Sequence, residues 1–324
     1  MATDPLPDEA VRAPVRAARL RSLGVSRREM DGPLWQPLAH GVRGWMGLDP
    51  SDPDVRIGML VESQPPGVVL GGWMALRVAG LAVMDGRTGL AAGALTPGLV
   101  HVGPAGRTRQ RPLLHVDRGV LAPNETLEIH GVRVLSPTAA VVGIARRYGV
   151  EEGLVAADAA WRAGLTDRHR LRAYVATLPG ARGVRAARQV VELADPRAVS
   201  PPESRLRYVW VVEAGLPAPL VNPTVLDLAG FVAGEPDLLD PDAAFAGEYD
   251  GAHHRDPTRH TDDNAREEGL EGLNLTVGRA TSIDIWSRRT QLVRRLLTGH
   301  HRGLSRDRRK DRFQVQVRPR TWAA

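Results

Sequence analysis

The chain of 324 residues is long enough for two or three domains, and 43% hydrophobic with 25% charged residues is the balance of an ordinary globular protein. The absence of cysteine excludes disulfides, a thiol nucleophile and thiolate-bound zinc. The net charge of +6 is compatible with a polyanionic partner, so where that charge lies matters more than its size.

The first fifty residues predict a small helical module. A helical run from Val11 to Leu23 ends in a glycine-containing turn, and Ser26 with Glu29 has the spacing of a capping box that starts a second helix. Residues 41–44 then predict a short basic strand or wing. We therefore expect a helix-turn-helix-like or winged-helix-like region over residues 1–50, although any small helical pair can produce this pattern.

No segment predicts a membrane span. The longest apolar run, Val68 to Met84, is interrupted by Arg77 and is too short to cross a bilayer, so we expect a buried helix there. The N-terminal residues lack the basic, then apolar, then small-residue order of a signal peptide, and a cytoplasmic protein is expected.

Helical motifs follow one another between residues 65 and 198. They comprise Gly71-Gly-Trp-Met-Ala-Leu-Arg77 with Gly80-Leu81, Val134-Leu-Ser-Pro-Thr138, and Asp158-Ala-Ala-Trp-Arg-Ala-Gly164. Their order resembles the AbiEi-type antitoxin family of type IV toxin–antitoxin systems, which implies a DNA-binding antitoxin with a cognate toxin as partner. Thr138-Ala139-Ala140 departs from the family pattern because it lacks the arginine, and Gly143 replaces the acidic residue.

A stretch rich in turn formers, Ala194 to Pro202, predicts a domain boundary. Beyond it the pattern alternates: a helix to Ala214, a strand at 221–228, a hairpin, a helix at 262–273, a strand at 275–280 and a helix at 287–297. This order predicts an α/β, or overall α+β, fold with a mixed sheet flanked by helices. We expect domains at 1–50, 51–195 and 196–300, then a basic flexible tail at 301–324.

Acidic residues gather in the hairpin between Glu235 and His254. If Leu239 pairs with Ala246, the ladder places Asp237 opposite Glu248, with Cβ atoms roughly 5 Å apart. Asp250 then shares the face of Glu248. Carboxylates so close repel unless a cation lies between them, which favours a site for Mg²⁺ or Mn²⁺. Acids beside a hairpin turn are also often merely solvated.

Ordered motifs surround this hairpin. Pro236-Asp237, Glu248-Tyr-Asp250-Gly and His253-His254 resemble the active-site hairpin of PD-(D/E)XK nucleases, in the branch similar to the very-short-patch-repair endonuclease. Ser200-Pro-Pro-Glu203-Ser-Arg-Leu-Arg207 resembles the S-x-x-E-S-x-L-R helix of that family. Asp263, Arg266, Leu270 and Leu273 resemble its D-x-x-R-x-x-x-L helix, and Val277-Gly278-Arg279 its next strand.

The resemblance implies a restriction-endonuclease-like domain that cleaves DNA with a divalent metal. It assigns metal binding to Asp237, Glu248 and Glu203. Asp250 stands where most of the superfamily has lysine, because Lys310 is the only lysine in the chain. His253 and His254 are then candidates for the general base or for stabilising the phosphorane-like transition state, although a histidine pair is often only surface decoration. Asn274 replaces a common glycine, which alters a turn.

Positive charge is concentrated at the C-terminal end. The segment from Arg288 to Arg320 contains twelve Lys and Arg but only two acidic residues, Asp307 and Asp311, which gives a local net charge of +10. We expect contacts with DNA phosphates from Arg308, Arg309 and Lys310 of this region and from Arg266 and Arg279. The alternative is a genome rich in G and C, which places arginine on solvated faces regardless of partner.

Two hypotheses follow from the sequence. The first is an enzyme, an Mg²⁺-dependent DNA endonuclease with an antitoxin-like, DNA-binding front half. The alternative is a non-catalytic DNA-binding antitoxin or transcriptional regulator whose nuclease-like domain does not use a metal. The intact Asp237, Glu248, Asp250 and His254 favour the first, and the missing lysine with the degraded block from Thr138 to Gly143 leaves the second open.

Overall fold

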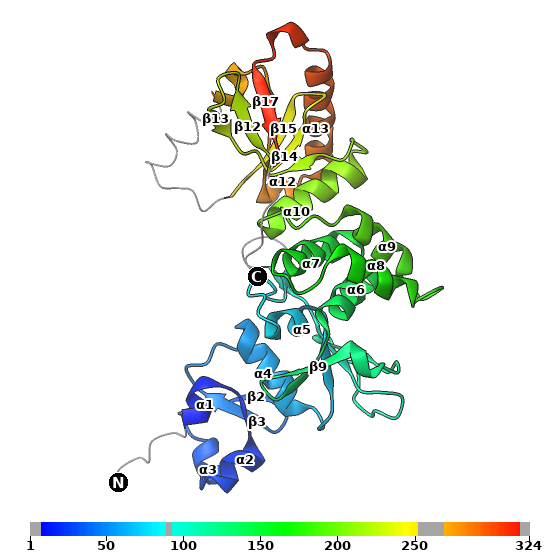
Figure 1. Cartoon of the computed structure of the whole chain (residues 1–324). Helices are drawn as coiled ribbons and strands as arrows, with labels where there is room; N and C mark the ends of the chain where they lie inside the picture. The colour runs from blue at the N-terminus through cyan, green and yellow to red at the C-terminus, as the bar shows by residue number, and fades with distance from the viewer. Residues whose placement is uncertain (1–7, 89–92, 252–268, 318–324) are drawn as a thin grey trace. The chain divides into compact units, whose positions relative to one another are not determined.

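The computed structural model describes residues 8–88, 93–251 and 269–317, and the chain divides into two compact units. The first unit comprises Met1–Thr88 and Ala94–Ala140, and the second comprises Gly89–Gly93 and Val141–Ala324. Both units contain helices and sheets, so the α+β fold class expected from the sequence is confirmed. Figure 1 labels many of these elements along the chain.

The first unit opens with a winged-helix-like module. Its elements are α1 (Asp8–Arg12), β1 (Val15–Arg16), α2 (Ala17–Ser22), α3 (Arg27–Met30), β2 (Trp35–Ala39) and β3 (Val42–Trp45). Strand β1 pairs antiparallel with β3, and β2 and β3 form the hairpin, or wing. The Ser26 hydroxyl accepts from the Glu29 N–H at 3.2 Å, and the Glu29 carboxylate accepts from the Ser26 N–H at 2.6 Å. The predicted capping box and wing are thus confirmed.

A five-stranded sheet forms the rest of this unit, in the order β8-β7-β4-β10-β9. Its strands are β4 (Val69–Gly71), β7 (Gly98–His101), β8 (Leu114–Asp117), β9 (Thr126–Ile129) and β10 (Val132–Leu135). The helices of this part are α4 (Pro53–Ser63), α5 (Gly72–Val78) and the 3-10 turn η1 (Pro123–Glu125). A separate small hairpin consists of β5 (Arg87–Thr88) and β6 (Ala94–Leu95). The single buried helix predicted for 68–84 is wrong, because Val69 begins a strand. Gly71 is extended, Gly72 has φ of +59°, and the helix begins only there.

The second unit begins with a group of helices that was predicted in outline. They are α6 (Pro137–Tyr148), which starts in the first unit, α7 (Val150–Arg162), α8 (Arg168–Ala176) and α9 (Val184–Leu193). Proline occupies the first position of α6, and Gly164 at φ of +71° follows the end of α7. The glycine stop expected from the sequence is therefore present.

A mixed sheet domain completes the second unit. Its first part is α10 (Pro201–Tyr208), the π-helical turn η2 (Val209–Glu213), β11 (Leu220–Val221), β12 (Thr224–Asp227), β13 (Val232–Gly234), β14 (Leu238–Asp240) and β15 (Phe245–Asp250); its second part is β16 (Thr276–Thr281), α12 (Ser282–Trp286), α13 (Arg289–Leu304), the 3-10 turn η3 (Arg308–Lys310) and β17 (Phe313–Gln316). One sheet has the order β11-β14-β15-β16, with β15 and β16 parallel and the other pairs antiparallel. The second sheet has the order β13-β12-β17.

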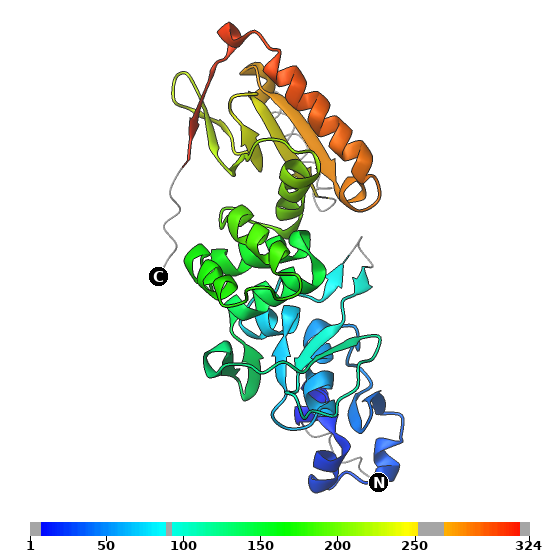
Figure 2. The ribbon, with the colours of Figure 1, turned by 90° about the vertical axis from the view of Figure 1, so that its right-hand side faces the viewer.

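Apolar side chains cover both faces of the four-stranded sheet. On one face Phe245 stacks on Trp210, with ring centroids 4.9 Å apart, and α13 packs there through Leu292 and Leu296. Figure 2 shows α13 running along this sheet. The opposite face contributes Leu239 and Ala246 to a second cluster, which includes Val225, Leu270 and Leu275. The sheet is therefore buried between helices and the three-stranded sheet.

The flexible tail expected from residue 301 is corrected by the structure up to residue 317. Helix α13 continues to Leu304, and β17 pairs antiparallel with β12 over four residues. Phe313 and Val315 pack against the apolar cluster of that sheet. The local charge hid a strand with alternating apolar residues, which carries part of the fold. Residues 318–324 lie outside the described residues.

Candidate functional site

The β14–β15 hairpin sets the geometry of the predicted site. Leu238 pairs with Gly247, and Leu239 pairs with Ala246, so the register predicted from the sequence is the observed one. One further step in the same register places Asp237 opposite Glu248. At the other end the Asp240 carboxylate accepts from the N–H groups of residues 242 and 243, at 2.9 and 3.2 Å, which fixes the turn.

Strand β16 extends these rows across the sheet. Ala246 pairs with Val277, Glu248 with Arg279, and Asp250 with Thr281. In-register neighbours on parallel strands share a face, so Arg279 lies beside Glu248 and on its side of the sheet. The apolar row of Leu239, Ala246 and Val277 is therefore followed by the row of Asp237, Glu248 and Arg279. This second row carries two carboxylates and one exposed guanidinium. This arrangement gathers opposite charges at the edge of the core.

The Asp237 side chain is oriented by its neighbours. Its Oδ2 atom accepts a hydrogen bond from the Tyr249 N–H at 2.6 Å, across the hairpin. Its carbonyl oxygen accepts from the Asn222 N–H at 2.9 Å. The hydrogen bonds from the Tyr249 and Asn222 N–H groups thus restrict the position of Asp237 and of its carboxylate.

Glu203 serves first as a helix-capping residue. Its Oε1 lies 2.8 Å from the Ser200 hydroxyl, and its Oε2 accepts from the Val199 N–H and the Asn222 amide, both at 2.9 Å. Ser200 is the N-cap of α10, so these bonds fix the start of that helix. Asn222 links Glu203 to Asp237, because it bonds to both.

Asn222 is a positioning residue that the sequence analysis missed. It has φ of +46°, a left-handed conformation that asparagine tolerates better than most residues. Its amide donates to the Arg197 carbonyl at 2.8 Å as well as to Glu203, and its backbone N–H donates to Asp237. The only sequence signal is an asparagine before Pro223, which indicates a turn.

The remaining predicted residues are scattered or lie outside the described residues. His253, His254 and Arg266 fall outside them. Arg308, Arg309 and Lys310 form η3, where the Arg308 guanidinium donates to the Asp242 carbonyl at 3.3 Å. Within residues 8–88, 93–251 and 269–317, no group of three or more His, Asp or Glu is placed to hold a metal. Asp237 and Glu248 alone match the one or two carboxylates by which proteins usually bind Mg²⁺.

Helix α10 is joined to α7 by a buried charge cluster. The Asp158 carboxylate accepts from the Ser204 hydroxyl at 2.6 Å, from the Asp195 N–H at 2.8 Å, and from the Arg207 guanidinium. Burial raises the pKa of Asp158, and the Arg207 charge and these hydrogen bonds oppose that shift. Ser204 and Arg207, which the sequence analysis placed in a nuclease motif, therefore hold two helices together.

A second cluster of ion pairs lies at the same helix contact. Arg205 bonds to Glu152 at 2.7 Å and to Glu151 at 3.1 Å, and its guanidinium lies 4.4 Å from the centre of the Trp286 ring. Arg289 of α13 binds Glu151 at 2.8 Å. The charges of Arg205 and Arg289 are thus neutralised by α7, and these two arginines are not presented to an external polyanion.

These elements define an α+β protein in which a winged-helix-like module precedes a helical region and a mixed-sheet domain. Residues 80–193 match the family model described as the AbiEi antitoxin C-terminal domain, so this part of the chain is antitoxin-like, as the sequence motifs indicated. The match begins in the first unit and ends with α9 in the second.

Two curated relatives come from Mycobacterium tuberculosis. They are the uncharacterized proteins MT2308 of strain CDC 1551 / Oshkosh and Rv2248 of strain ATCC 25618 / H37Rv, each 31% identical over 150 residues. The alignment covers 46% of this chain and 55% of each relative, so the chain spans about half their length. No solved structure matches the chain. None of the helices in its described part is long and apolar enough to span a bilayer.

Proposed function

We propose that the protein is a DNA-binding regulator of the antitoxin kind. The observation that carries this proposal is the antitoxin-domain match at residues 80–193, which directly follows a winged-helix-like module and two further helices. The family description implies a cognate toxin as a partner besides DNA, because an antitoxin acts against a toxin. The first module would bind DNA, and the antitoxin-like segment would act on the toxin.

Helix α3 and the wing provide the DNA-binding surface in this proposal. In a helix-turn-helix module the second helix enters the major groove, and arginines on it contact phosphates and base edges. Arg27 and Arg28 lie on α3 and are exposed, the Arg27 side chain at 91%. Arg43 on β3 is held 3.6 Å from Asp31, which positions the wing next to α3.

A binding titration with charge-matched variants tests the proposal. The duplex is taken from upstream of the protein's own coding sequence, with a scrambled duplex of equal length for comparison. Arg27→Gln/Arg28→Gln should lower affinity for the upstream duplex and reduce the slope of log affinity against log salt by about 1.8, or about 0.9 per lost phosphate contact. Arg107→Gln/Arg109→Gln, an equal charge change on an exposed loop, should leave both unchanged.

Two results would reject the regulator. The first is equal binding to the two duplexes with no effect of the α3 variant. The second is a protein that does not relieve the toxicity of a toxin encoded beside it when the two are expressed together. The first result would remove the DNA function, and the second would remove the antitoxin function.

We also propose, as a second candidate function, metal-dependent DNA scission by the mixed-sheet domain. The specific observation in its favour is the β14–β15 register, which sets Asp237 opposite Glu248 with Asp250 on the same face. Asp237 and Glu248 would hold the ion, which would supply Lewis-acid stabilisation of a phosphoryl oxygen. Glu203 would support Asp237 through Asn222, and His253 or His254 would take up a proton.

A further inference from the structure

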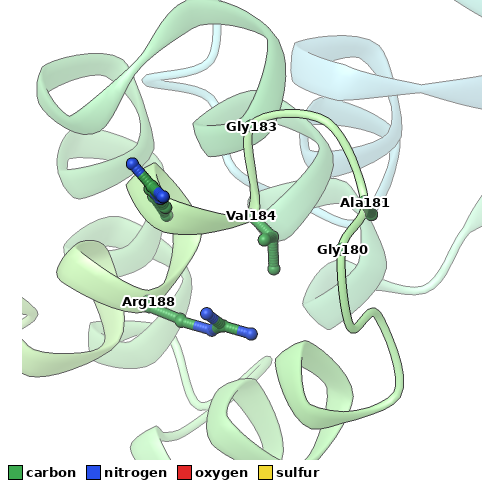
Figure 3. Close-up of a pocket in the computed structure, with 6 residues that line it drawn as sticks. Gly180, Ala181, Gly183, Val184 and Arg188 are labelled. Carbon is green, nitrogen blue, oxygen red and sulfur yellow. The ribbon is translucent and has the colours of Figure 1, made fainter.

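A hollow of about 430 Å³ opens beside the loop that precedes α9. It is lined by Gly180, Ala181, Gly183, Val184, Arg185 and Arg188. Figure 3 shows the Val184 and Arg188 side chains pointing into the space next to the glycine loop. A volume near the lower end of the range for small-molecule sites accommodates a ligand of nucleotide size.

The loop that forms one wall is held in place by α6. The Arg146 side chain donates to the Arg182 carbonyl at 3.0 Å. Gly183 has φ of +77°, and a Cβ atom there would lie 2.1 Å from the Arg146 carbonyl oxygen. Only glycine allows this approach, so the wall of the hollow is fixed by the close contact of the Gly183 backbone with α6 together with the Arg146 hydrogen bond.

The arginines around the hollow differ from those on the neighbouring helix. In α8, Arg168 donates to the Ala194 carbonyl at 2.9 Å, Arg170 lies 3.3 Å from Asp167, and Arg172 lies 2.9 Å from Glu192. By contrast Arg185 and Arg188 are exposed and form no ion pair or side-chain hydrogen bond with residues in the described part of the chain. Composition alone does not explain why arginines thirteen to twenty residues apart divide in this way.

The charge around the hollow is not balanced locally. Between residues 168 and 191 the sequence contains six arginines and no Asp or Glu. Arg185 and Arg188 lie three residues apart on α9, which brings them to one side of the helix, where they line the hollow. Two guanidinium groups on one side of a helix repel each other, and an anion between them would remove that repulsion. Arginine pairs bidentately with phosphate, so phosphate is the anion that this geometry favours.

We propose that this hollow binds a phosphate-bearing small molecule of nucleotide size. Arg185 and Arg188 contact the phosphate. Ala181 and Val184 give an apolar surface for the sugar or base. The Gly180–Gly183 segment leaves the backbone accessible, because its two glycines carry no side chain.

Isothermal titration calorimetry of the full chain with four probes tests this site: inorganic phosphate, AMP, ADP and adenosine. ADP and AMP should bind with dissociation constants below about 1 mM, and adenosine, which lacks phosphate, should not. Arg185→Gln/Arg188→Gln should weaken ADP binding by about tenfold or more, as expected for the loss of charged contacts. The matched control Arg107→Gln/Arg109→Gln removes the same charge from another exposed loop and should leave ADP affinity unchanged.

Three outcomes would overturn the proposal. One is the absence of binding by phosphate, AMP and ADP. Another is an equal loss of ADP affinity in both double variants, which would reduce the effect to net charge. The third is binding of duplex DNA through Arg185 and Arg188 without any binding of AMP or ADP. The hollow would then be part of a surface that binds polyanions. Circular dichroism of both variants establishes that they are folded.

Discussion

The Asp158 carboxylate of α7 accepts a 2.6 Å hydrogen bond from the Ser204 hydroxyl of α10, at a position where both residues are 2% exposed. Arg207, also on α10, adds its charge to the same carboxylate. Asp158 lies in the antitoxin-like segment, and α10 begins the mixed-sheet domain. The pairing therefore joins two regions that the sequence motifs presented as separate.

Removing Asp158 should strongly destabilise the second unit. In Asp158→Ala the Arg207 guanidinium, 6% exposed, stays buried without its anionic partner. Breaking one side of a buried pair costs about 3–5 kcal/mol. Urea denaturation should show this decrease in the free energy of unfolding. Glu192→Ala is the matched control, because its pair with Arg172 is more than 60% exposed and contributes at most about 1 kcal/mol. Equal effects of the two variants would contradict the role assigned to burial.

Gly303 should be the least replaceable glycine of α13. A Cβ atom at this position would lie 2.1 Å from the Ala243 carbonyl oxygen, which belongs to the backbone of the hairpin turn. Gly303→Ala should therefore cost about 1–3 kcal/mol, the usual range for overpacking. Gly143→Ala in α6 meets nothing within 4 Å and should stabilise by about 0.5–1 kcal/mol. Thermal unfolding of both variants checks the opposite signs, and stabilisation by Gly303→Ala would contradict the contact.

The Arg306–Asp311 pair predicts a pH dependence of stability. The hydrogen bonds from Arg306 lower the pKa of Asp311, and the Asn274 amide adds to this. An aspartate with a lowered pKa contributes stability above its unfolded pKa of about 3.9 and loses it as the pH falls through the folded value. The stability difference between the wild type and Asp311→Asn should thus be present at pH 7 and shrink below about pH 4. Denaturant titrations at several pH values measure it, and a difference that does not change with pH would contradict this assignment.

The sequence located the hairpin better than it explained the surrounding charges. The turn chemistry of Asp240-Pro241 and the chain return that follows predict a hairpin, and the pairing of Leu239 with Ala246 that was assumed for it is the observed one. Asp158 could not be recognised, because its partners Ser204 and Arg207 are 46 and 49 residues away. Charged residues in contact across such separations look like solvated ones until the fold is known.

The prediction for the C-terminal residues was wrong for the same reason, because contacts between distant residues cannot be seen in the sequence. A run with many arginines indicated a flexible tail, yet Arg306 binds Asp311 and the Asp242 carbonyl, and β17 follows. Phe313 and Val315 alternate with glutamines, which is a strand signal too short to outweigh the charge pattern. The role of Asn222 could not be predicted either, since it depends on three partners, Arg197, Glu203 and Asp237, that no local pattern reveals.

The nuclease proposal makes a sharp prediction about Asp237 and Glu248. Asp237→Asn and Glu248→Gln keep the shape of each side chain and remove one anionic metal ligand. Under this proposal the wild type cleaves DNA with Mg²⁺ or Mn²⁺, EDTA abolishes cleavage, and each variant lowers the rate by about 100-fold or more. Gel assays on single-stranded, duplex and mismatched substrates measure the rates.

A control and a second variant separate chemistry from folding and from DNA binding. Asp242→Asn removes an exposed carboxylate at the opposite end of the same hairpin and should leave scission unchanged. Asn222→Ala should reduce scission while leaving DNA affinity intact, because it removes the amide bonds to Glu203 and Arg197 and strains the left-handed backbone that donates to Asp237, and none of these groups faces a phosphate in this proposal. A wild type that binds DNA and cleaves none of the substrates with either metal would reject the nuclease and leave the regulator standing. If Asp242→Asn matched Asp237→Asn, cleavage would depend on hairpin charge in general and not on a metal held opposite Glu248.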